Sequence, residues 1–210
     1  MKLIGIVGTN SDTSTNRKLL QFMVKHFAST AEIESCEIAS IPAFNEPEDK
    51  HIPEEVQVLS DKILASDGVI IATPEYDHSI PAALKSVLEW LSYITRPLIN
   101  KPVMIVGASH GSLGTSRAQA HLRQILDAPE IKARVLPGSE FFLGRSLQAF
   151  DTDNNLLYDD KIKELEGDFS EFITFLKLTN EINKANPEQT ANRRNFAWLA
   201  VEDVNGGKLS

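Results

Sequence analysis

Short apolar runs alternate with amphipathic segments along most of the chain, and this alternation limits the folds open to it. Three of the runs are continuous, rich in isoleucine and valine, and followed by turn residues: 3–7, 68–72 and 103–108. Runs of this kind are typical of parallel strands that are buried on both faces. Residues 32–38 alternate more in polarity and predict a strand nearer an edge, and residues 132–136 predict a fifth strand.

Between these runs, apolar residues recur at three- and four-residue spacing, which predicts amphipathic helices. The helices are predicted from residue 15 onward and over 56–64, 82–94, 118–126 and 159–182. Such alternation requires right-handed crossovers and a parallel sheet with helices on both faces. Five strands, and a first loop without the G-x-G-x-x-G pattern, predict a flavodoxin-like α/β fold. This is a three-layer, doubly wound, five-stranded parallel sheet of order 2-1-3-4-5.

The length of 210 residues favours one domain with an extension over two domains. We assign residues 1–182 to the α/β domain and residues 183–210 to a C-terminal extension. This extension is too apolar for a solvent-exposed tail without a function, because it contains Phe196, Trp198 and Leu199. We predict that Phe196 and Trp198 clasp a partner chain or cover the site.

Composition excludes several classes of partner. The formal net charge of −8 repels phosphate backbones, so we expect no nucleic-acid partner. No apolar stretch approaches the ~20 residues that span a bilayer, and the N-terminus lacks a signal-peptide pattern, so we expect no membrane partner. Cys36 is the only cysteine; it cannot form an internal disulfide, and we expect it to be buried near the end of a strand. These features predict a cytoplasmic protein.

The loop after the first strand has the composition of an anion site. Seven of the nine residues 8–16 carry hydroxyl or amide side chains, and a helix follows directly. Hydroxyls and backbone N–H groups at a helix N-terminus attract phosphate, which the helix dipole also favours. The alternative is an ordinary loop in which Ser14 or Asn16 caps the helix. The spacing is not that of a P-loop, so nucleotide hydrolysis is not expected.

The loops after the third and fourth strands also have unusual compositions. In an open parallel sheet, ligands bind outside the carboxyl ends of the strands, where the strand order reverses. Pro74 and Pro81 stiffen the third-strand loop, and three glycines in residues 107–114 permit close backbone approach to a ligand. His78 and His110 lie in these loops; hydrogen bonding is favoured over a metal pair, and we predict no metal site.

Together these loops resemble the NADPH-dependent FMN reductase family of flavodoxin-like NAD(P)H:FMN, quinone, azo-dye and chromate reductases. The resemblance covers about residues 2–180. It rests on residues of the three loops in register: Gly8, Thr9, Ser14, Asn16, Pro74-Glu75-Tyr76, Ser79-Ile80-Pro81, Lys85 and Arg117-Ala118. It implies FMN as cofactor and NADPH or NADH as electron donor.

The resemblance also assigns residues to cofactor binding. It places the FMN phosphate at the first loop, on Thr9, Ser11, Ser14, Thr15 and Asn16. It implies that the next loop lines the isoalloxazine ring, largely through main-chain groups of Pro74, Glu75, Tyr76 and Asp77. The loop after the fourth strand, residues 107–117, is called the glycine loop below. It would close over the other edge of the ring with Ser109, His110, Gly111 and Gly114. Ser11, Asp77 and His110 stand where the family often has Arg, Asn and Pro.

The expected activity is hydride transfer from NAD(P)H to FMN and electron transfer to a small acceptor: a quinone, an azo compound, a flavin or a metal oxyanion. No residue is expected to be catalytic, because FMN carries the chemistry. One alternative is a flavodoxin-type carrier that does not oxidise nicotinamide itself. Another is a serine hydrolase, since residues 107–111 match G-x-S-x-G around Ser109. No Asp or Glu lies between Ser109 and His121, the last histidine, so the normal triad order cannot be completed.

The helix predicted over residues 82–94 carries large apolar residues on more than one face, among them Leu88, Trp90, Leu91 and Tyr93. Members of the resembling family commonly form dimers around this region, with the flavin near the interface. We therefore predict a homodimer or a dimer of dimers.

Overall fold

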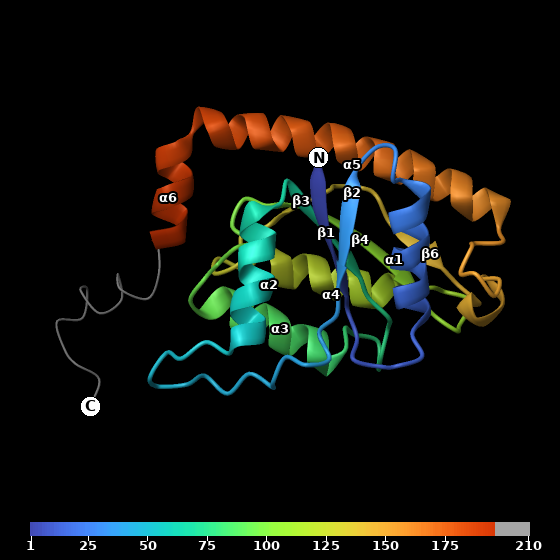
Figure 1. The fold of residues 1–210 in the computed structure, drawn as a ribbon, viewed down its shortest axis with the longest axis horizontal. Coiled ribbons are helices and arrows are strands. Elements are labelled where there is room, and N and C mark those ends of the chain that lie inside the picture. The colour runs from blue at the N-terminus through green and yellow to red at the C-terminus, as the bar shows by residue number, and fades with distance from the viewer. Residues whose placement is uncertain (196–210) are drawn as a thin grey trace.

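The computed structural model of the chain describes residues 1–195. Strands and helices alternate as predicted (Figure 1). The strands are β1 (Lys2–Val7), β2 (Glu32–Cys36), β3 (Gly68–Ala72), β4 (Pro102–Ala108), β5 (Arg134–Val135) and β6 (Phe141–Leu143). The helices are α1 (Thr15–His26), α2 (Glu54–Ala65), α3 (Ala82–Tyr93), α4 (Ser116–Leu126), α5 (Asp159–Ala185) and α6 (Pro187–Asn195).

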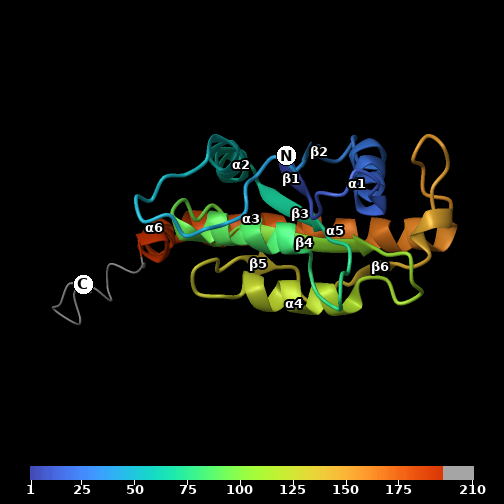
Figure 2. The same ribbon diagram turned by 90° about the horizontal axis from the view of Figure 1, so that it is seen from below.

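The strands form one parallel sheet of order β2-β1-β3-β4-β5, which confirms the predicted flavodoxin-like order. Alternate residues of each strand face opposite helical layers. Leu3 and Val7 pack with α1 and α5 in one core cluster, whereas Ile4 and Ile6 pack with α2, α3 and α4 in the other. Figure 2 shows α1 and α2 beside the β2 edge of the sheet and α4 beside β5 and β6. Within residues 1–195, no helix is long and apolar enough to cross a membrane.

The fifth position of the sheet is shared by two short strands. The predicted strand over 132–136 is reduced to β5, which pairs with the start of β4 at Pro102 and Val103. Pro137 cannot donate to a ladder and Gly138 has a φ of 75°, so pairing is interrupted there. The chain then returns to the same edge as β6, which pairs with β4 at its carboxyl end. The sequence interpretation assigned no strand to β6.

The second apolar face of α3 is covered by the same chain. Trp90 donates its indole N–H to the Pro42 carbonyl at 2.9 Å, and the Tyr93 hydroxyl contacts the Pro47 carbonyl at 3.0 Å. Phe44 packs edge-on against both aromatic rings. The residues from which the dimer was inferred therefore already have partners within the chain, and the homodimer stays a prediction that this helix no longer supports.

The first part of the C-terminal extension is helical. The helix predicted to end at residue 182 continues to Ala185, and α6 begins at Pro187, a residue favoured in the first turn of a helix. Asn100, just before β4, accepts from the Asn183 amide at 3.0 Å through its carbonyl and donates to the Thr190 hydroxyl at 3.2 Å. This anchor lies at the amino end of β4. Phe196 and Trp198, the predicted clasp, lie outside the described residues.

Candidate functional site

The carboxyl ends of β1, β3 and β4 open into a cavity of about 620 Å³. Residues of all three predicted loops line it: Ser11, Thr13, Ser14, Thr15, Asn16, Pro74, Glu75, Tyr76, His78, Ala108, Ser109, His110, Gly111, Ser112, Leu113, Gly114 and Arg117. The structure thus brings together every predicted cofactor-binding residue except Thr9 and Asp77. The cavity is also lined by six residues that were not among the predicted cofactor-binding residues: Thr13, His78, Ala108, Ser112, Leu113 and Arg117.

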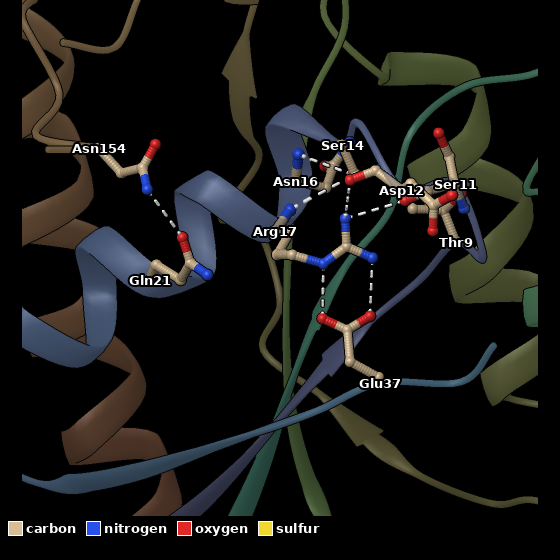
Figure 3. Close-up of polar contacts among 9 residues, drawn as sticks. All are labelled: Thr9, Ser11, Asp12, Ser14, Asn16, Arg17, Gln21, Glu37 and Asn154. Carbon is tan, nitrogen blue, oxygen red and sulfur yellow. Dashed lines mark hydrogen bonds and ion pairs between the residues drawn. The ribbon is translucent and has the colours of Figure 1, made fainter. Parts of the chain in front are cut away.

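Thr9 is absent from the lining because it is fully buried beneath the first loop. Its hydroxyl accepts the Ser11 N–H at 3.2 Å and lies 3.4 Å from the Tyr76 hydroxyl. Ser14 caps α1, and its hydroxyl accepts the N–H groups of Asn16 at 3.2 Å and Arg17 at 3.4 Å (Figure 3). Thr9 and Ser14 therefore fix the shape of the loop.

Asn16 joins the first loop to the last residue of β4. Its amide donates to the Ala108 carbonyl at 2.8 Å and accepts the Ala108 N–H at 2.8 Å, and the side chain is buried. Next to it, the buried Thr15 hydroxyl lies 2.9 Å from the Ser146 hydroxyl. Both side chains tie α1 to the opposite side of the cavity, so their hydrogen bonds within the chain position the loops.

The first loop leaves donors free for an anion. Within the described part of the chain, no hydrogen-bond partner is found for the backbone N–H groups of residues 12–15. These groups stand at the positive end of α1, whose first turn carries no acidic residue. Among the described residues that line the cavity, Arg117 is the one Lys or Arg, and it is ion-paired with Glu75. An anion here would be held mainly by main-chain donors.

Glu75 connects the loop after β3 to the start of α4. One carboxylate oxygen accepts the N–H groups of Arg117 at 2.9 Å and Ala118 at 3.2 Å, and the other lies 3.3 Å from the Arg117 guanidinium. Thr115, the N-cap residue of α4, makes no side-chain cap. Glu75 supplies that cap instead, and the helix dipole attracts a carboxylate at this end of α4.

Asp77 and His78 form a two-residue turn. Tyr76 and Ser79 exchange backbone hydrogen bonds of 3.0 and 2.9 Å, and the two central residues have φ values of 49° and 63°. Positive φ at both central positions is the signature of a type I′ turn, which favours Asn and Gly. The exposed Asp77 side chain does not line the cavity, whereas His78 does.

Replacing His78 with glycine is expected to stabilise the protein by about 1 kcal/mol, because a left-handed backbone strains residues with a Cβ atom. Urea unfolding of the purified variant measures the change. The matched control is His110→Gly, since the φ of His110 is not positive, and this change should bring no gain. A His78→Gly protein less stable than the parent would mean that the side chain makes contacts worth more than the strain.

The glycine loop rests on a segment that the sequence interpretation did not assign. The Ser109 N–H donates to the Leu143 carbonyl at 2.9 Å, the Arg145 N–H to Gly111 at 2.8 Å, and the Ser146 N–H to Ser109 at 3.0 Å. A Cβ atom at Gly144 would lie 2.6 Å from the Ser112 carbonyl oxygen. The sequence feature that could have predicted this supporting segment is the apolar triplet 141–143 followed by Gly144.

The three loop glycines have different reasons to be glycine. A Cβ atom at Gly107 would lie 1.8 Å from the Thr115 hydroxyl, and Gly114 has a φ of 63°. At Gly111, by contrast, φ is not positive and a Cβ atom would meet only the Ser109 hydroxyl, at 4.0 Å. The protein's own packing does not require glycine at this position, which lines the cavity. The open space suits a flat ligand that approaches the backbone closely.

The surroundings of Ser109 do not support a serine hydrolase. Its hydroxyl contacts the Gly111 carbonyl at 3.4 Å. His121 lies 3.1 Å from the Ser79 hydroxyl instead. No base activates Ser109 among the described residues.

In the same part of the chain, no group of three His, Cys, Asp or Glu side chains is arranged to hold a metal ion. Cys36 is buried, as predicted, and burial raises the pKa of its thiol.

Comparison with known proteins gives a consistent result. The family model for NADPH-dependent FMN reductase matches residues 1–148. The NADH:(hydroxy)cinnamate reductase subunit CrdA of Vibrio ruber is 56% identical, over 96% of this chain and 100% of its own. The NADH-dependent flavin reductase subunit 2 of Lactobacillus johnsonii is 43% identical, over 84% and 98%. Among solved structures, the flavoenzyme NAD(P)H:(acceptor) oxidoreductase FerB of Paracoccus denitrificans superposes with a TM-score of 0.76 at 25% identity, over 85% of this chain and 98% of its own.

Proposed function

The chain belongs to the NADPH-dependent FMN reductase family, and from this premise we propose how its three loops divide the work. The protein is an FMN-dependent oxidoreductase that takes hydride from NAD(P)H and delivers electrons to a small acceptor. When bound, FMN supplies the hydride and electron chemistry, so the residues of the chain have to hold it, orient it and leave one face accessible.

The first loop holds the phosphate. The unpartnered N–H groups of residues 12–15 at the start of α1 are the observation that carries this assignment. The hydroxyls of Ser11 and Thr13, which line the same wall of the cavity, add further donors. Thr9, Thr15 and Asn16 support this wall from behind, through bonds to Tyr76, Ser146 and Ala108.

The other two loops hold the ring. Gly111 offers open backbone toward the cavity, with Tyr76 and His110 also on its lining. The Glu75 carboxylate is occupied at α4 and the Asp77 side chain lies outside the cavity. Both residues would therefore act through main-chain groups or through the shape of their loop. The proposed cofactor-binding set keeps all the predicted residues and adds Thr13 and His78. The predicted residues are Thr9, Ser11, Ser14, Thr15, Asn16, Pro74, Glu75, Tyr76, Asp77, Ser109, His110, Gly111 and Gly114.

We further propose that NADH is the preferred donor and that the chain works beside a second kind of subunit. Two relatives with high coverage are named as NADH-dependent, and both are named as subunits. The name of the relative at 56% identity supports a (hydroxy)cinnamate as the terminal acceptor. Because that relative is named as one subunit of the reductase, we propose that reduction of this acceptor needs the second subunit. For the isolated chain, the homodimer stays a prediction that rests on the family resemblance alone. The nicotinamide donor and the single buried cysteine support the cytoplasm as its location.

The test is an anaerobic absorbance experiment on protein reconstituted with FMN and desalted. We expect retained flavin absorbance that bleaches with NADH, and more slowly with NADPH. Flavin that stays oxidised with both donors would support the flavodoxin-type carrier, and no retained flavin would refute the cofactor assignment. The reduced chain alone should pass electrons to a free quinone or flavin and not to cinnamate. Reduction of cinnamate by the isolated chain would refute the need for a second subunit.

A further inference from the structure

Arg17 connects α1, the first loop and the end of β2. Its Nε and Nη2 atoms donate to the two carboxylate oxygens of Glu37, at 2.6 and 2.8 Å (Figure 3). Its Nη1 atom donates to the backbone carbonyls of Ser11 and Asp12, both at 2.9 Å. One guanidinium therefore holds two consecutive peptide groups of the loop.

This contact fixes the direction of the loop's N–H groups. In a trans peptide the carbonyl and the N–H of the next residue point in opposite directions. With the carbonyls of Ser11 and Asp12 turned toward Arg17, the N–H groups of Asp12 and Thr13 point away from it. These two donors have no partner within the described chain, and Thr13 lines the cavity. The guanidinium thus sets the orientation of half of the free donors at the start of α1.

Glu37 keeps the guanidinium in place. The bidentate pair holds the plane of the guanidinium in one orientation, which a single-point contact would not do. The Arg17 side chain is 21% exposed and that of Glu37 is 47% exposed. Ion pairs this exposed contribute little to the stability of the fold. The role of the Arg17–Glu37 pair is therefore to orient the guanidinium.

We propose that Arg17 is a positioning residue for the phosphate of FMN, acting through the Ser11 and Asp12 carbonyls, and that Glu37 sets the orientation of its guanidinium. The inference rests on the proposed phosphate site. It assigns phosphate recognition to two residues that do not line the cavity, and it explains how a loop with Ser11 and an acidic Asp12 can present donors to an anion.

The test compares FMN with riboflavin, which has the same ring and no phosphate. Dissociation constants are measured by flavin fluorescence for the parent protein and for Arg17→Gln, Arg17→Lys and Glu37→Gln. We expect Arg17→Gln to weaken FMN binding about 10-fold or more, because two oriented donors are lost, and to leave riboflavin binding within about 2-fold. Arg17→Lys and Glu37→Gln should have smaller effects in the same direction.

Lys18→Gln is the matched control, because it removes the same charge from an exposed side chain one residue along α1. An equal loss in Lys18→Gln would mean that only net charge matters. If Arg17→Gln lowers the affinities for FMN and riboflavin equally, the role of Arg17 is structural and not specific to the phosphate. Unchanged FMN affinity in Arg17→Gln would refute the proposal. If Arg17→Gln does not fold, Arg17→Lys carries the same comparison. A parent protein that binds riboflavin as tightly as FMN overturns the inference together with the proposed phosphate site but leaves the flavin-dependent activity standing, whereas one that binds neither flavin overturns the proposed function as well.

Discussion

Gly111→Val is expected to lose FMN almost completely while the flavin-free protein stays as stable as the parent. A Cβ atom at Gly111 meets open space, so the substitution costs the fold little, within about 0.5 kcal/mol. The same open space belongs to the cavity, where two additional methyl groups would occupy the position proposed for the ring. We expect affinity to fall about 100-fold or more, which corresponds to about 2.7 kcal/mol. Fluorescence titration with FMN measures this loss.

The stability half of this prediction separates a blocked site from a damaged fold. Thermal unfolding of flavin-free Gly111→Val should match that of the flavin-free parent. Gly111→Ala adds one carbon at the same position, and we expect it to retain more FMN than Gly111→Val. If Gly111→Val binds FMN as tightly as the parent, the ring does not pass over this loop, and the assignment of the ring to the glycine loop is wrong.

Gly107→Ala should instead damage the fold itself. Its Cβ atom would lie 1.8 Å from the Thr115 hydroxyl and 2.7 Å from the Thr73 carbonyl oxygen. Thr115 is fully buried and its hydroxyl accepts from the Gln119 amide at 3.0 Å, so it cannot turn away without breaking that bond. Overpacking of this kind costs about 3 kcal/mol, which should lower the melting temperature by about 6–12 °C in a protein of this size.

Differential scanning calorimetry of the flavin-free protein measures this effect. The matched control is again Gly111→Ala, the same substitution four residues along the chain where no close contact exists. A Gly107→Ala protein that melts with the parent would show that β4 and the loop before α4 can separate, and that their close approach does not define the site.

The sequence was sufficient for the sheet order because its three central strands are continuous apolar runs. The central strands β1, β3 and β4 have their predicted positions; the bounds of β3 are as predicted, and β1 and β4 each begin one residue earlier. The edge was harder. β5 and β6 have two and three residues, and Pro137-Gly138 separates them, so neither forms a periodic pattern. Short edge strands are defined by pairing with β4, which is a property of the fold rather than of the local sequence.

The candidate site shows the same division. Loop composition predicted which segments meet, because each follows the carboxyl end of a central strand. It did not predict that the side chain of Asn16 would hydrogen-bond to Ala108, or that the carboxylate of Glu75 would cap α4. Nor did it reveal Arg17, which reads as one of many surface cations until Glu37 is brought beside it by the pairing of β2 with β1. Hydrogen bonds between segments far apart in sequence leave no local signal.

The bonds of Asn16 to Ala108 and of Thr15 to Ser146 join loops that belong to different strands. Such cross-links make the cavity a preorganised receptor. The conformational entropy of the two loops is lost when the chain folds, so little of it has to be lost again when the cofactor arrives. The two walls also cannot open separately, and departure of the cofactor then requires both to yield together. We therefore expect a flavin held in this way to exchange slowly and to stay with one protein molecule through many rounds of turnover.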